Sequence, residues 1–285
     1  MNDLPPLPLT HVPGIAVLCI LSSGLTCCGA KPPALAASAG PPTAPTVAAA
    51  KPFMNYTAEI VNRYPHDSSA FTQGLLFANS ETLVESTGMN GHSSLRRVEL
   101  KTGRVLQKVD LPQRYFGEGL ALLKGKLYQL TWKDHKGFIY DAATLRQTGE
   151  FPYAGEGWGL TTDGTSLILS DGTPQLRFLD PDTFAVTRTI QATHQGKPVD
   201  RLNELEFIDG EIFANIWGAD LIARLDPVTG QATGVINCTN LFPAATRNTP
   251  EQVLNGIAWH AESKRLLITG KWWPEVFEIT LKPVS

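Results

Sequence analysis

Polar and aromatic side chains recur at one position in five similar segments of the chain. In each segment this residue is followed by a small or acidic residue and then by an aliphatic one. The position recurs at intervals of 40 to 52 residues and is filled by Gln73, Glu118, Trp158, Asn203 and Asn255. Glu118 lies between two glycines and has no basic residue beside it in the sequence. A carboxyl group in apolar surroundings has a raised pKa, which suits it to proton transfer near neutral pH.

A second recurring position lies at the end of the strand that follows each segment. It is filled by Thr87, Trp132, Asp171, Trp217 and Lys271. Each unit of about 40–50 residues holds about four short strand-like runs, separated by turns such as Asp-Pro and Thr-Gly, and this is typical of a β-propeller blade. The sequence therefore predicts an all-β, five-bladed β-propeller over residues 53–285, in which residues 56–65 complete the last blade. A β-sandwich is the alternative, but it does not explain the spacing.

Equivalent positions of successive blades surround one channel, so we expect the two sets to meet in one concave site. There Glu118 is the candidate general acid/base, and Lys271 can balance its charge or polarise a carbonyl group. The tryptophans expected to line the pocket are Trp132, Trp158 and Trp217. Gln73 and Asn203 are either substrate contacts or hydrogen-bonding groups within the ring.

Each assignment has a structural alternative. Glu118 alone is more often a turn residue or a hydrogen-bond acceptor within the ring, and Lys271 alone is more often a surface lysine. Asp171 is expected to be structural because it lies in a Ser-Asp-Gly turn. The remaining tryptophans, at positions 259, 272 and 273, are assigned to the core.

The N-terminal residues differ in composition from the rest of the chain. Residues 14–28 form a short apolar segment, and a Pro/Ala-rich tract follows it. We expect residues 1–28 to be an export signal or a lipoprotein-like leader, and residues 29–52 to be a disordered linker. The protein is then exported to the periplasm or secreted. A lipid anchor near Cys28 is the only membrane attachment expected, because no run of eighteen apolar residues occurs.

Composition argues against several other functions. The formal net charge of −3 gives no basic surface for nucleic acid. Three of the four cysteines lie in the leader, so Cys238 has no partner for a disulfide within residues 53–285. The six histidines lack ligand-like spacing, and no phosphate-binding loop or nucleophile elbow occurs. The spacing therefore gives no support for a metal site, although folding could still bring two histidines together around an adventitious metal.

Several motifs together resemble one enzyme family. They are FTQG at 71–74, FGEGL at 116–120, LTWK at 130–133, GEGWGL at 155–160, LNELE at 202–206, NIWG at 215–218, and LNGIAW with LITGKWW between 254 and 273. These motifs are similar to those of the plant and bacterial glutaminyl-peptide cyclotransferases, and the resemblance covers roughly residues 57–282. The family has a five-bladed propeller fold and is unrelated to the zinc-dependent animal enzyme.

The resemblance implies a function for individual residues. It places Glu118 at the position of the catalytic carboxylate, with Asn203 and Lys271 as its polar partners. Phe71 and Gln73 match the pair in the first blade, and the three tryptophans of the pocket match as well. The implied reaction converts an N-terminal glutamine of a peptide or protein to pyroglutamate with release of ammonia, without a cofactor, in an enzyme expected to be a monomer.

Two other functions remain open at this point. A non-catalytic propeller that binds a partner or serves as a scaffold needs no unpaired carboxylate in a pocket lined by tryptophan. A metal-dependent propeller hydrolase would need a cluster of acidic or histidine residues on the ring. The ring offers only Glu118 as an acid, with Asn203 and Asn255 as further oxygen ligands.

Overall fold

The computed structural model describes residues 52–284, and this part of the chain is built almost entirely of β-strands. Its helical content is one 3-10 turn, Ala244–Thr246. The predicted leader and nearly all of the predicted linker lie outside the described residues. The expectation of an all-β fold with almost no helix is confirmed.

Most strands form four-stranded antiparallel sheets in sequence order. One sheet contains β2 (Thr72–Asn79), β3 (Thr82–Thr87), β4 (Ser94–Glu99) and β5 (Val105–Asp110). The next contains β6 (Gly117–Leu123), β7 (Lys126–Thr131), β8 (Lys136–Asp141) and β9 (Gln147–Pro152). A third contains β10 (Leu160–Thr162), β11 (Leu167–Ser170), β12 (Gln175–Leu179) and β13 (Val186–Gln191). A two-stranded ribbon follows, with β14 (Thr193–His194) and β15 (Lys197–Pro198).

The remaining strands form one eight-stranded sheet that joins the two ends of the described chain. Its first half is β16 (Leu202–Ile208), β17 (Glu211–Ile216), β18 (Leu221–Leu225) and β19 (Ala232–Asn237). Its second half is β20 (Leu254–His260), β21 (Arg265–Gly270), β22 (Glu275–Val284) and β1 (Met54–Pro65). Strand β1 is antiparallel to β22 and parallel to β19. The predicted pairing of residues 56–65 with the last strands is therefore correct.

The hairpins between the third and fourth strands of the sheets share one turn chemistry. In three of them an aspartate Oδ1 accepts a hydrogen bond from the backbone N–H of a threonine three residues later. The pairs are Asp141 with Thr144 at 2.9 Å, Asp180 with Thr183 at 2.7 Å, and Asp226 with Thr229 at 2.8 Å. These side chains close the turn locally. The Asp-Pro turns of the sequence correctly predicted the hairpins at Asp180 and Asp226.

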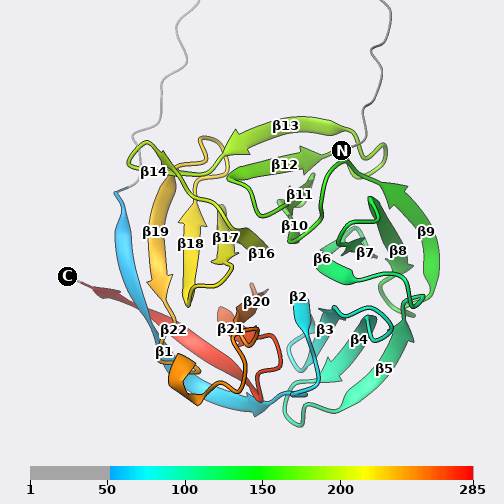
Figure 1. Cartoon of the computed structure of the whole chain (residues 1–285), viewed down its shortest axis with the longest axis horizontal. Coiled ribbons are helices and arrows are strands. Elements are labelled where there is room, and N and C mark those ends of the chain that lie inside the picture. Colours follow the sequence, from blue (N-terminus) through cyan, green and yellow to red (C-terminus); the bar gives the residue numbers. More distant parts are fainter. Residues whose placement is uncertain (1–51, 285) are drawn as a thin grey trace, which may run out of the picture. The chain divides into compact units, whose positions relative to one another are not determined.

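The core lies in layers between successive sheets rather than in one central cluster. Apolar residues of β3 and β4 pack against β7 and β8, those of β7 pack against β11, and those of β11 and β12 pack against β16 and β17. The halves of the eight-stranded sheet pack in the same way, and β20–β22 pack back against β2 and β3. Each sheet, or half of the eight-stranded sheet, therefore packs against a neighbour on both faces, while outer strands such as β5 and β13 are largely exposed. Figure 1 shows the sheets around a common centre, with β2, β6, β10, β16 and β20 nearest to it.

The innermost strands approach one another closely because glycines follow four of the five recurring ring residues. A Cβ at Gly119 would overlap the backbone of Gly159 and Leu160, with the nearest atom at 2.4 Å. A Cβ at Gly159 would overlap the carbonyl oxygen of Asn203. Only glycine allows two backbones to come this close. The ring positions are therefore held at short distances from one another.

Two glutamates of β16 satisfy inner-edge N–H groups that have no strand partner. The Glu204 carboxylate accepts hydrogen bonds from Leu75 N at 3.3 Å and Ile257 N at 2.9 Å. The Glu206 carboxylate accepts them from Trp259 N at 3.1 Å and Thr161 Oγ1 at 3.3 Å. Burial raises the pKa of Glu206 to about 8 and that of Glu204 well above its usual range. Through these carboxylates β16 is joined to three neighbouring inner strands.

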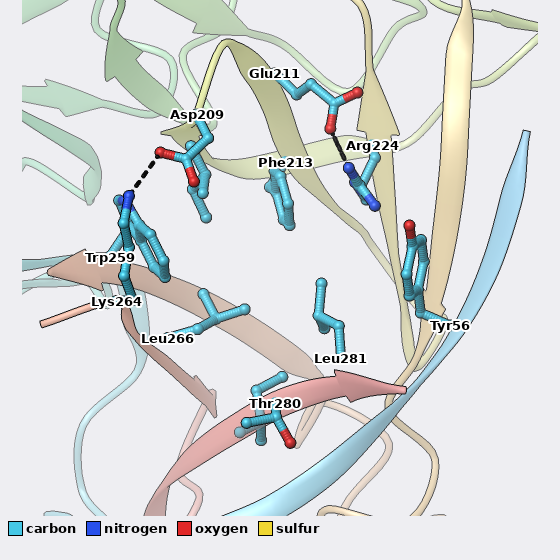
Figure 2. A pocket seen from close by; sticks show the side chains of 12 residues that line it. Tyr56, Asp209, Glu211, Phe213, Arg224, Trp259, Lys264, Leu266, Thr280 and Leu281 are labelled. Atoms are coloured by element: carbon cyan, nitrogen blue, oxygen red, sulfur yellow. Dashed lines mark hydrogen bonds and ion pairs between the residues drawn. The ribbon is translucent and has the colours of Figure 1, made fainter. Parts of the chain in front are cut away.

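A groove of about 350 Å³ lies where β16 ends and β17 begins (Figure 2). Phe213 and Leu266 contribute to its apolar lining, and the ion pair between Lys264 and Asp209, at 3.2 Å, lies beside it. Asn203 is the second residue of β16, whereas the groove begins at Ile208, the last. None of the predicted site residues lines this groove.

Replacing Gly159 with alanine tests the close approach of the inner strands. The new Cβ meets the backbone of Asn203, which cannot rotate away, so we expect a loss of about 2 kcal/mol or more in the free energy of unfolding. Urea denaturation measures it. Gly149→Ala is the control, since its Cβ would find only Ile139, at 3.5 Å, and should change stability little. Equal stability of the two variants would contradict this packing.

Candidate active site

All eight residues predicted for the site line one cavity of about 520 Å³. They are Phe71, Gln73, Glu118, Trp132, Trp158, Asn203, Trp217 and Lys271. The side chains come from the starts of inner strands and from the residues that follow second strands, as the repeat predicted. The cavity therefore joins segments that are up to 200 residues apart in the sequence.

Glu118 lies near the start of β6 and is 4% exposed. Its backbone carbonyl accepts a hydrogen bond from the hydroxyl of Ser86 in the neighbouring sheet, and the next residue, Gly119, donates its N–H to Trp158 O at 2.8 Å. Both neighbouring sheets thus fix the backbone here. Burial raises the pKa of Glu118 well above its usual value, and the negative charge of Glu156 adds to this effect. The charge of Lys271 and a hydrogen bond from Gln73 oppose it.

Lys271 follows β21, and its backbone N–H is bonded to Val253 O at 2.9 Å. The side chain is buried, with Nζ 4.6 Å from the centre of the Phe71 ring. Burial lowers the pKa of Lys271 to about 8, although the charges of Glu118 and Glu251 oppose the change. A lysine with this pKa is still mostly protonated at pH 7.

Lys271 is the cation that the sequence placed opposite Glu118. No basic residue lies beside Glu118 in the chain, and Lys271 reaches the same cavity from a distant segment. In the folded protein Lys271 is close enough to lower the pKa of Glu118 by charge attraction. Desolvation of the carboxyl group outweighs this attraction, so the pKa of Glu118 is raised despite the cation.

Two amide side chains complete the polar part of the cavity. Gln73 Oε1 accepts a hydrogen bond from Asn255 Nδ2 at 2.9 Å, which leaves its NH₂ group directed to Glu118. Asn203 is 2% exposed, and its carbonyl oxygen is held by the Ser170 hydroxyl at 2.7 Å. The side-chain oxygen of Asn203 is buried and has no hydrogen-bond partner within residues 52–284. A buried acceptor without a partner is costly, and a ligand N–H can satisfy it.

Aromatic rings form most of the remaining wall. Phe71 makes edge contacts with Trp272 and Phe116, at centroid distances of 4.7 and 5.8 Å, and Phe116 lies 5.6 Å from Trp132. On the other side Trp158 and Trp217 make an edge contact at 6.3 Å. Trp217 is 42% exposed and therefore lies at the outer part of the wall.

The sequence interpretation missed several lining residues. Phe116, Met89, Glu251 and Trp272 also line the cavity. Trp272 was assigned to the core, and this was wrong. Its φ of +57° turns the backbone between the two adjacent tryptophans, so Trp273 is fully buried while Trp272 lines the cavity. The position of Phe116, directly before the Gly-Glu-Gly sequence, could have indicated it.

Other members of the two recurring sets have structural roles. Asn255 is fully buried and donates its side-chain NH₂ to Thr72 O and to Gln73. Asp171 accepts hydrogen bonds from Thr173 and pairs with Arg177 at 3.3 Å, as the turn reading predicted. The hydroxyl groups of Thr87 and Ser94 form a hydrogen bond at 2.7 Å.

Within the described range no cluster of three or more His, Cys, Asp or Glu side chains has the arrangement of a metal site. Cys238 is buried and burial raises the pKa of its thiol. No helix within residues 52–284 has the length and apolar character needed to cross a membrane.

Comparison with known proteins identifies the family. The family model for glutamine cyclotransferase matches residues 33–281. This chain belongs to the glutamine cyclotransferase family. A glutaminyl-peptide cyclotransferase of Arabidopsis thaliana is 45% identical over 232 residues, which are 80% of this chain and 72% of the plant protein. The crystal structure of Myxococcus xanthus glutaminyl cyclase matches this chain with a TM-score of 0.77 and 39% sequence identity. The match covers 82% of this chain and all of the Myxococcus chain.

The family match begins earlier than the sequence motifs indicated. The motifs suggested a start near residue 57, whereas the match to the family model begins at residue 33, within the predicted linker. The C-terminal limit agrees to within one residue, at 281 against 282.

The raised pKa of Glu118 predicts how stability depends on pH. The folded protein holds a proton on this group at pH values where the unfolded chain, with a pKa near 4.5, has lost it. The group therefore lowers the free energy of unfolding as pH rises from 4.5 through the pKa of the folded state. In Glu118→Gln this loss is absent. We expect its stability relative to wild type to increase with pH in that window, by at most about 1.4 kcal/mol per pH unit.

Urea denaturation at pH 4 to 8 measures this difference. The control is Glu150→Gln, which changes a glutamate on the surface of β9. A difference between Glu118→Gln and wild type that does not depend on pH would contradict the raised pKa.

Proposed function

We propose that this protein is a glutaminyl-peptide cyclotransferase, which converts an N-terminal glutamine of peptides or proteins to pyroglutamate and releases ammonia. The burial of Glu118 beside Lys271 in an aromatic cavity is the observation that supports this activity most strongly. Membership of the glutamine cyclotransferase family supports the same reaction. A cavity of this size and lining is suited to a small side chain with a few polar groups.

Glu118 is the proposed general acid/base. The neutral α-amine of the substrate attacks the γ-carbonyl carbon, and the Glu118 carboxylate takes a proton from the attacking nitrogen. This attack closes the ring. The protonated Glu118 then gives its proton to the γ-amide nitrogen, the bond between that nitrogen and the γ-carbon breaks, and ammonia leaves as the γ-carbonyl group re-forms. One group can perform both transfers when its pKa lies nearer to neutrality than that of an ordinary glutamate, as burial ensures here.

Lys271 and Asn203 are the proposed polar partners in the reaction. The addition step places negative charge on the γ-oxygen, and the Lys271 ammonium can stabilise that charge in the water-poor cavity. The unpaired side-chain oxygen of Asn203 can accept a substrate N–H, while its NH₂ group can donate to an oxygen. Gln73 fixes the orientation of Glu118 through the hydrogen bond from its amide.

The aromatic wall is the proposed substrate-binding surface. Phe71, Trp132, Trp158 and Trp217 enclose the aliphatic part of the glutamine side chain and exclude water. Because the attack is intramolecular, holding the side chain folded back on the amine lowers the barrier further.

The wider organisation follows the same proposal. The sheets and the two halves of the eight-stranded sheet are the blades of a five-bladed propeller, and β1 closes the ring. The enzyme acts as a monomer after export to the periplasm or secretion, with residues 1–28 as signal or lipoprotein leader and residues 29–52 as a linker. Neither nucleic acid nor a cofactor takes part.

Glu118→Gln tests the acid/base assignment. Glutamine has nearly the same shape but cannot exchange the proton, so we expect ammonia release from a peptide with an N-terminal glutamine to slow at least about a hundredfold. A coupled ammonia assay measures it, with Glu150→Gln as the matched control. Unchanged release in a folded Glu118→Gln protein would remove Glu118 from this role.

Asn203→Ala separates binding from folding. Its side-chain oxygen has no partner to lose, so we expect little change in Tm, but about a tenfold loss in kcat/KM because a hydrogen bond to the substrate is absent. Thermal unfolding and steady-state kinetics measure the two effects. Wild-type kcat/KM in this variant would show that Asn203 makes no contact with the substrate.

A further inference from the structure

Glu156 lies in the loop between β9 and β10 and connects two tryptophans of the cavity. A single carboxylate oxygen, Oε2, accepts hydrogen bonds from Trp132 Nε1 at 2.7 Å and from Trp158 Nε1 at 3.0 Å. Trp132 directly follows β7, whereas Trp158 precedes β10 in the next sheet. Glu156 thus fixes two indole rings that belong to different sheets.

The backbone around Glu156 is itself held in place. Arg177 donates a hydrogen bond to Glu156 O at 3.2 Å, and Gly157 N donates to Trp132 O at 3.0 Å. The other carboxylate oxygen lies 3.7 Å from Lys133 Nζ, which also lies 3.9 Å from the centre of the Trp132 ring. A charged acceptor in a fixed position forms stronger hydrogen bonds than a neutral one. The two ring planes are therefore set by Glu156 as well as by packing.

We propose that Glu156 is a positioning residue of this site, which orients Trp132 and Trp158 through one shared oxygen and keeps a negative charge near Glu118. It does so without contact with the reacting atoms. This role rests on the proposed cyclotransferase function and adds a determinant of substrate binding and of the pH range of activity.

The electrostatics agree with this geometry. Hydrogen bonds from Trp158 and Trp132, together with Lys133, hold the pKa of Glu156 below its usual value, so the group stays charged. Its charge helps to raise the pKa of Glu118. The other titratable groups that interact with Glu118 or Lys271 are Glu251, which raises the pKa of Lys271, and Tyr153, whose own pKa Glu118 raises.

Two substitutions separate the effects of shape and charge. Glu156→Gln keeps an oxygen that can accept from both indoles but removes the charge. We therefore expect a KM within about threefold of the wild-type value. We also expect the acidic limb of the kcat–pH profile to shift to lower pH by about half a unit, because loss of a nearby anion lowers the pKa of Glu118 and that of a bound α-amine. Glu156→Ala removes the acceptor, so we expect KM to rise about tenfold.

Kinetics with a Gln-initiated peptide from pH 5 to 9 provide the readout. Glu150→Gln serves as the control, since it removes one negative charge from the adjacent β9 without contacting either indole. It should match wild type in KM and in pH profile. An unshifted acidic limb in Glu156→Gln, or a wild-type KM in folded Glu156→Ala, overturns the proposal when the wild-type enzyme is active.

An indole measurement keeps this test independent of the proposed function. The six tryptophans give separate Nε1–H signals in a ¹⁵N NMR spectrum, and Trp132→Phe and Trp158→Phe assign two of them. We expect both signals to move in Glu156→Ala and neither to move in Glu150→Gln. If wild type releases no ammonia, the cyclotransferase function fails while this result still decides the positioning role. Indole signals that stay in place in Glu156→Ala overturn the positioning role. If Glu156→Ala does not fold, the role is overturned when Glu156→Gln shows both unmoved indole signals and an unshifted acidic limb of the kcat–pH profile.

Discussion

The close approach of the inner strands is the constraint on which the rest of the structure depends. Each inner strand has a free edge toward the centre, where N–H groups are shielded from solvent and need acceptors. Glycines such as Gly119 and Gly159 allow the backbones to meet, and Glu204 accepts the N–H groups of Leu75 and Ile257 from two neighbouring strands. The residues directly before Gly119, Gly159 and Glu204 are Glu118, Trp158 and Asn203, and these are thereby held close together at one end of the inner strands.

The same closeness determines the chemistry of the cavity. Glu118 and Lys271 are both buried, so each loses solvation of its charged form, and their pKa values move toward each other. An exposed pair would stay fully ionised at neutral pH and would exchange protons poorly with a substrate. The aromatic wall keeps water away from both groups, while the negative charge of Glu156 acts on Glu118.

The repeat made much of this arrangement predictable. Because equivalent positions of similar segments meet around a centre, the spacing alone brought Gln73, Glu118, Trp158 and Asn203 together. The Asp-Pro and Thr-Gly turns located hairpins. What the spacing could not provide was the direction of a side chain after an irregular backbone residue. The positive φ of Trp272 is such a case.

The recurring positions placed Lys271 opposite Glu118, but they did not indicate the shared oxygen of Glu156. That contact depends on side-chain conformations between two sheets, for which no short sequence pattern exists. Titration of the Glu118 carboxyl group by ¹³C NMR, assigned with Glu118→Gln, tests the central claim most directly. The structure predicts a pKa well above the ordinary 4.5, and titration at that ordinary value would contradict it.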